Sequence, residues 1–297
     1  MQYLDSFTLP TRDREEQFLM FSHNHKLEMS CYASSLYPFG IFPEKRLNHI
    51  DFEPITVFCG SNGSGKSTLL NVIAEKLSVP RSAPFNKTPL YEEYLRFCEA
   101  NLRFGSRLPK GSMIITSDDV FDYLLDIRAV NEGVDNRRED LFEEYNDFTD
   151  PKAPRFQMSS LEDYDELKKR NLARSRTKSK YVSAQVRREI RTRSNGESAF
   201  LYFTDRIREN ALYLLDEPEN SLSASLQLEL AEFIENSARF YGCQFIISSH
   251  SPFMLAMKGA AIYDLDREPA ERVKWTDIEN VRIYHKFFEK YRDDFGR

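Results

Sequence analysis

The most constraining feature of this sequence is a glycine-rich segment, Gly60-Ser61-Asn62-Gly63-Ser64-Gly65-Lys66-Ser67-Thr68, with the pattern G-x-x-x-x-G-K-[ST]. It follows an apolar, β-type run at 55–59. It precedes a segment in which Leu69, Ile73 and Leu77 recur at helical spacing. A strand, a glycine-rich loop and a helix in this order predict a phosphate-binding loop.

Each residue type in this loop has a chemical role. Glycines let the backbone turn so that successive N–H groups converge on phosphate oxygens. The start of the following helix adds its positive dipole end. Lys66 supplies a point charge to the outer phosphates, and the Ser67 hydroxyl is a candidate magnesium ligand. We therefore expect residues 60–68 to bind a nucleotide.

Composition narrows the class of protein. The chain has 297 residues, 41% of them hydrophobic, which suffices for a sizeable core and suggests about two domains. Its net charge of −6 argues against an overall basic nucleic-acid binder but allows a local basic patch. The four cysteines are scattered, as expected for reduced thiols. No apolar run approaches the ~18–20 residues of a membrane span, and the first residues do not resemble a signal peptide. We expect a cytoplasmic protein.

Alternating strand and helix patterns predict an α/β fold with a mostly parallel sheet and helices on both faces. Residues 1–80 should contain an N-terminal antiparallel β portion and the phosphate-binding loop. Residues 81–193 should form a mainly helical insertion, with a strand near 113–116 that belongs to the main sheet. The acidic stretch 132–166 is expected to be a mobile connection. Residues 194–297 should complete the main domain.

Two acids end an apolar strand in the last third of the chain. The run 211–215 is followed by Asp216 and Glu217. In α/β sheets, ligands bind at the carboxyl ends of strands. Asp216 is therefore expected to hold magnesium, directly or through water, and Glu217 to act as general base toward an attacking water.

Three further elements accompany these acids. His250 ends the next apolar strand, where it could contact a γ-phosphate or the attacking water. The segment Ser194-Asn195-Gly196-Glu197 precedes a helix; it could meet a phosphate, and it also fits an ordinary S-x-x-E helix cap. Asp118 follows the strand at 113–116 and is a weaker candidate for the metal site.

Together these segments resemble the ABC-type ATPase heads of the RecF and structural-maintenance-of-chromosomes (SMC) class, and most of all the small stand-alone bacterial AAA-family ATPases. Residues 60–68 resemble the Walker A motif, 194–197 the signature motif and 212–218 the Walker B motif. Residues 219–223 are similar to the D-loop, with Ser223 where transporter heads usually carry Asp, and His250 is similar to the switch histidine. No clear Q-loop glutamine follows the strand at 113–116; Asp118 occupies a similar place, and the resemblance makes it the candidate for that role.

This resemblance implies a P-loop NTPase that binds ATP and Mg²⁺ and hydrolyses ATP. Two copies would sandwich two ATP molecules, the signature of each acting on the nucleotide of the other, and hydrolysis would separate them. Such a switch suits DNA repair or antiphage defence with a separately encoded effector. An ABC transporter-type subunit and a slow-turnover regulatory ATP-binding protein are the alternatives.

The middle of the chain contains a basic stretch at 165–195. It has eleven basic and three acidic side chains, a net charge of about +8. It could bind a nucleic-acid backbone in a salt-dependent manner. A solvated helical arm paired with the acidic stretch is the competing interpretation.

Overall fold

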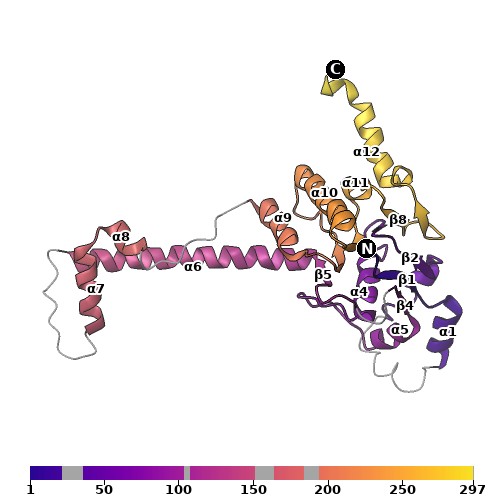
Figure 1. Ribbon diagram of the computed structural model, residues 1–297, viewed down its shortest axis with the longest axis horizontal. Coiled ribbons are helices and arrows are strands. Elements are labelled where there is room, and N and C mark those ends of the chain that lie inside the picture. Colours follow the sequence, from indigo (N-terminus) through magenta and orange to yellow (C-terminus); the bar gives the residue numbers. More distant parts are fainter. Residues whose placement is uncertain (22–35, 104–107, 151–163, 184–193, 297) are drawn as a thin grey trace. The chain divides into compact units, whose positions relative to one another are not determined.

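The computed structural model describes residues 1–21, 36–103, 108–150, 164–183 and 194–296 (Figure 1). These residues form two compact units: 1–121 together with 195–297, which we call the head, and 122–194, which we call the insertion. The sequence predicted an insertion from residue 81, whereas residues 81–121 belong to the head, since β5 at 113–116 is part of the main sheet.

The head is built on a six-stranded sheet of order β5-β6-β7-β3-β8-β9. Its strands are β3 (Ile55–Cys59), β5 (Met113–Thr116), β6 (Leu212–Asp216), β7 (Gln244–Ser248), β8 (Ala261–Asp264) and β9 (Glu271–Val273). The first five run parallel, and β9 pairs antiparallel at the edge. Every residue of β3 and β7 is buried, so both faces of the central sheet are covered. The predicted mostly parallel α/β sheet is confirmed.

A second, antiparallel sheet of order β2-β1-β4 lies in the N-terminal part of the head. It consists of β1 (Leu4–Thr8), β2 (His49–Asp51) and β4 (Glu99–Leu102). The buried side chain of Gln244, at the start of β7, joins it to the main sheet: its Oε1 accepts from Tyr3 N at 2.7 Å and Leu4 N at 2.9 Å, and its Nε2 donates to Leu4 O at 2.8 Å.

Helices surround the two sheets. Those of the head are α1 (Arg12–Phe21), α3 (Ile41–Glu44), α4 (Lys66–Lys76), α5 (Tyr91–Phe97), α9 (Asn195–Arg206), α10 (Ala224–Phe240), α11 (Pro252–Leu255) and α12 (Glu279–Lys290), with short 3₁₀ turns η2 (Trp275–Asp277) and η3 (Arg292–Phe295). The helix α4 packs against β6 and β7, and α10 against β7. In the part of the chain described, no helix is both long and apolar enough to cross a membrane.

The insertion is helical and has a small core of its own. The long helix α6 (Ser117–Thr149) begins in the head, and α7 (Tyr164–Ser175) and α8 (Lys178–Ser183) follow. The buried core comprises Leu141, Phe148, Ala173, Tyr181 and Val182. The expectation of a mobile connection over 132–166 is therefore wrong for 132–149. Leu141 and Phe148 recur at helical spacing and are buried, while the charged residues that suggested a loop line the rest of the helix.

Candidate functional site at the carboxyl edge of the sheet

Three predicted motifs meet at one edge of the main sheet. The neighbouring strands β6, β7 and β3 are parallel, so their carboxyl ends lie together. The phosphate-binding loop follows β3, Asp216 ends β6 beside Ser248, and Ser248 ends β7. Segments far apart in the sequence thus form a single site at the position where α/β sheets bind ligands.

The glycine-rich loop needs glycine at its first and last turns. Gly60 has φ +150°, and a Cβ there would lie 2.6 Å from Ser64 Oγ. Gly65 has φ +94° and directly precedes α4. Behind the loop, Asp266 accepts hydrogen bonds from Ser61 N at 2.6 Å and from Ser61 Oγ at 2.9 Å. The carboxylate after β8 therefore fixes the beginning of the loop.

Lys66 is the first residue of α4, and its side chain is only 4% exposed. Its Nζ donates to Gly60 O at 2.9 Å and Ser61 O at 3.1 Å, and lies 3.7 Å from Glu217 Oε1. Burying an ammonium is costly unless it is compensated. These partners keep the charge inside the loop, where phosphate oxygens can replace the carbonyls.

Ser67 and Asp216 form the candidate metal site. Ser67 Oγ donates to Asp216 Oδ1 at 3.0 Å, and Ser248 Oγ donates to the same oxygen. Burial raises the pKa of Asp216, although both hydrogen bonds act in the opposite direction. A hydroxyl and a carboxylate are hard oxygen ligands that fit Mg²⁺, and a cation would stabilise the buried charge. Asp118 is exposed at the start of α6, and its part in the metal site stays a prediction.

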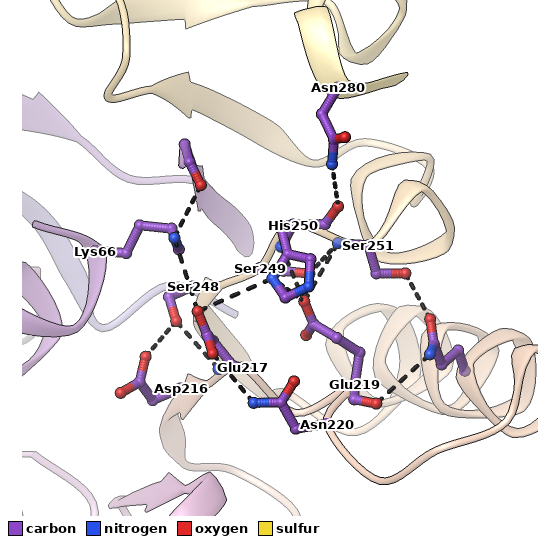
Figure 2. Close-up of polar contacts among 12 residues, drawn as sticks. Lys66, Asp216, Glu217, Glu219, Asn220, Ser248, Ser249, His250, Ser251 and Asn280 are labelled. Atoms are coloured by element: carbon purple, nitrogen blue, oxygen red, sulfur yellow. Dashed lines mark hydrogen bonds and ion pairs between the residues drawn. The ribbon is translucent and has the colours of Figure 1, made fainter. Parts of the chain in front are cut away.

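Glu217 is held in a strained but well-defined position. Its φ is +48°, which is uncommon for a residue with a Cβ. Its N–H donates to Ser248 O at 3.0 Å and Ser248 Oγ at 3.1 Å, and Asn220 Nδ2 donates to its Oε2 at 3.1 Å. This leaves Oε1 directed at Lys66 and His250 (Figure 2). Strain of this kind is characteristic of functional sites.

His250 lies on the open side of Glu217. Its side chain is 45% exposed, and Nδ1 is 3.9 Å from Glu217 Oε1 and 3.4 Å from Glu219 Oε1. Residues 249–251, which we call the switch loop, donate to the same Glu219 oxygen through the Ser249 hydroxyl and the backbone N–H groups of His250 and Ser251 (Figure 2). In addition, Asn280 of α12 donates to His250 O at 3.3 Å.

The signature-like segment lies at the start of α9. Asn195 and Glu197 are exposed, and Gly196 is half-buried. A Cβ on Gly196 would lie 3.0 Å from Leu226 Cδ1 and 3.3 Å from Ser221 O. The first turn of α9 therefore packs closely against Ser221 of the D-loop-like segment and Leu226 of α10, and only glycine allows this approach without displacing neighbours.

The structure adds Ser248 and Asp266 to the site, and it gives contacts there to Glu219 and Asn220, which the sequence had placed only in the D-loop-like segment. Each one follows or ends a strand of the main sheet, which is the signal that could have found them. Within the basic stretch, Arg187, Arg188, Arg191 and Arg193 lie outside the described residues. Of the described part, Lys168 and Lys169 of α7 are exposed.

The fold and the site define a P-loop nucleoside triphosphatase. A family model described as "AAA domain, putative AbiEii toxin, Type IV TA system" matches residues 99–256, and another described as "AAA domain" matches residues 37–75. The first match spans more than half of the chain, which therefore belongs to this AAA-domain family. The family that the motifs predicted is confirmed. The chain accordingly belongs to the ATP-binding class of proteins.

Solved structures give more distant likenesses. An SMC head domain from Thermotoga maritima has 13% identity and a TM-score of 0.34, covering 76% of this chain and 92% of that one. A Pyrococcus furiosus Smc head bound to the C-terminal domain of ScpA has 15% identity and a TM-score of 0.37, covering 82% and 95%. A dimeric, post-hydrolysis structure of the ATP-binding cassette MJ0796 bound to ADP and Pi has 13% identity and a TM-score of 0.37. The match covers 77% of this chain and 90% of that one. Among curated proteins, none matches significantly.

Proposed function

We propose that this protein binds ATP with Mg²⁺ at the carboxyl edge of the sheet and hydrolyses it. One observation carries the proposal: Glu217 Oε1 lies within 4 Å of both Lys66 Nζ and His250 Nδ1, which come from distant parts of the sequence, and the Ser67–Asp216 contact is in the same site. A phosphate-binding cation, two magnesium ligands and a candidate base thus share one site. An isolated glycine-rich loop would bring none of these partners.

In this proposal each side chain has one task. Lys66 and the loop amides bind and orient the outer phosphates. Ser67 and Asp216 would hold Mg²⁺, which supplies positive charge against the phosphate oxygens. Glu217 accepts a proton from the attacking water, since Asn220 fixes its carboxylate and Ser248 fixes its backbone N–H. His250, being half exposed, is free to contact the γ-phosphate or that water.

ATP would also act as a switch by joining two heads. The exposed start of α9, residues 194–197, is proposed to complete the nucleotide site of a second copy. The close contact of Gly196 with the D-loop-like segment supports this, because a movement of one would be transmitted to the other. The closed pair would form with ATP and separate after hydrolysis.

The biological role is proposed from the family. Its description names the AbiEii toxin of a type IV toxin–antitoxin system. We therefore favour antiphage defence over DNA repair, with a separately encoded effector that responds to the ATP-bound dimer.

The test compares the parent with Glu217→Gln. The variant should retain ATP binding, lose about 100-fold or more in turnover, and form ATP-dependent dimers. Glu229→Gln, an exposed glutamate on α10, is the matched control and should behave as the parent. Calorimetry, phosphate release and light scattering provide the three readouts. Unchanged turnover in Glu217→Gln would remove the residue from its role, and a monomer at high protein concentration with ATP would reject the dimer.

A further inference from the structure

The D-loop-like segment contains a buried carboxylate that serves the switch loop. Glu219 is 5% exposed and lies three residues after Asp216. Its Oε1 accepts hydrogen bonds from Ser249 Oγ at 2.7 Å, from His250 N at 2.8 Å and from Ser251 N at 3.2 Å (Figure 2). One oxygen therefore receives three donors from three consecutive residues, and the contact fixes the path of the chain through His250.

The other carboxylate oxygen is used differently. Glu219 Oε2 is buried, and no donor reaches it among the residues that the structure describes. A buried carboxylate oxygen without a partner is destabilising, and in a native protein it indicates a function that outweighs the cost. A glutamine could accept the same three hydrogen bonds without a charge. Anchoring the loop therefore does not by itself require the negative charge.

That charge faces the imidazole of His250. Nδ1 lies 3.4 Å from Glu219 Oε1 and 3.9 Å from Glu217 Oε1, so both carboxylates are near the same ring nitrogen. Carboxylates accept hydrogen bonds and do not donate them when ionised. A proton on Nδ1 is thus favoured, whereas a lone pair there would face two negative charges. Contacts of this length commonly shorten when a substrate completes the site.

We propose that Glu219 is a positioning residue for His250. Its carboxylate anchors the switch loop and fixes the proton of the imidazole on Nδ1, which leaves the lone pair of Nε2 to accept a hydrogen bond from water. The inference rests on the proposed function, because His250 matters only if this edge of the sheet handles ATP. A neutral histidine side chain in water carries its proton mainly on Nε2, so the two tautomers distinguish a positioned ring from a free one.

The first test needs no nucleotide. Nitrogen-15 NMR of histidine-labelled protein at about pH 8.5, above the ordinary imidazole pKa of about 6.5, reports which ring nitrogen carries the proton. His250→Gln assigns the signal. The parent should show mainly the Nδ1–H tautomer, and Glu219→Gln should shift the ring toward Nε2–H, because an amide oxygen is a weaker acceptor than a carboxylate. An Nε2–H tautomer in the parent would overturn the proposal.

The second test separates positioning from a structural role. Glu219→Gln should lower kcat by about tenfold or more with little change in the KM for ATP. In a protein that already carries His250→Gln, Glu219→Gln should lower kcat little further, because Glu219 acts on the reaction through the His250 ring, which is then absent. An equal fall in both backgrounds would overturn the proposal. Ser249→Ala, which removes one donor to Oε1 and retains the carboxylate, is the matched control and should keep the parent's tautomer.

These outcomes differ from a failure of the proposed function. If the parent does not hydrolyse ATP, the ATPase proposal is wrong, while the NMR experiment still decides whether Glu219 sets the state of His250. If Glu219→Gln fails to fold, Glu219→Asp keeps the negative charge and should retain the Nδ1–H tautomer. A ring that is Nε2–H in Glu219→Asp as well as in the parent would reject the pairing.

Discussion

The head and the insertion use ionisable residues in opposite ways. In the head, three largely buried ionisable side chains hold loops at the sheet edge. Lys66 donates to the phosphate-binding loop, Asp216 accepts from Ser67, and Glu219 accepts from the switch loop. In the insertion, Arg170 pairs with Glu166 at 2.7 Å along α7, and the buried core is mainly apolar. Surface pairs of this kind contribute little to stability, whereas buried charges need a purpose. The ionisable residues of the head therefore form a candidate functional site, whereas those of the insertion lie around a small apolar core.

The largest effect should come from the buried cation of the head. Lys66→Ala removes the charge that faces the phosphates and the ammonium that lies 3.7 Å from Glu217 Oε1. ATP affinity should fall by about 1000-fold, or about 4 kcal/mol. Isothermal titration with the exposed Lys258→Ala as control measures it. Similar ATP affinity in Lys66→Ala and in the control would show that the phosphates bind elsewhere.

The insertion should respond through its core and leave the nucleotide site intact. Leu141 is fully buried, and Leu141→Ala should destabilise the insertion by about 3 kcal/mol through lost burial and a cavity. Hydrogen exchange should increase in α7 and α8, while ATP affinity stays at the parent's value. Glu139→Ala, on the exposed side of the same helix, is the control. A parallel loss of ATP affinity would mean that the two units are coupled.

The basic stretch tests whether the insertion has a ligand of its own. Changing Arg187, Arg188, Arg191 and Arg193 to Gln should weaken binding to a duplex DNA or RNA by about tenfold and reduce its salt dependence, for all sequences alike. Basal ATPase activity should survive. Equal binding by variant and parent would leave the stretch as a solvated arm. Loss of ATPase activity would assign the charges to the nucleotide site of a partner copy.

The two regions also differ in how far the sequence predicted them. The motifs around Lys66, Asp216 and His250 were found because each one adjoins a strand with a strong apolar pattern, and parallel strands place their ends together. The positions of Glu219 and Asp266 after strands are visible in the sequence, but their hydrogen-bond partners were not predictable. They depend on side chains that meet across 30 and 205 positions of the chain, and only the folded loops define those distances. In α6, charge density obscured the helical spacing of a few apolar residues.

The smallest effect is expected at a buried carboxylate that lies outside the nucleotide motifs of the sequence. Glu15 of α1 is 3% exposed, and its Oε2 accepts a hydrogen bond from Gly40 N at 2.7 Å. Burial raises the pKa of Glu15 to about 7 from an ordinary value of 4.5. The folded protein therefore holds this proton more tightly than the unfolded chain. The associated stability is complete below pH 4.5 and is lost as the pH rises through about 7.

Glu15→Gln keeps an acceptor for Gly40 and removes the titration. Its free energy of unfolding should exceed that of the parent by on the order of 1 kcal/mol at about pH 8 and should match it at about pH 4, below the ordinary pKa of a glutamate. Urea unfolding at the two pH values measures the difference, with Glu16→Gln, an exposed neighbour on α1, as control. An equal gain at both pH values would place the effect in packing, and no gain at either would show that the pKa of Glu15 is not raised in the folded head.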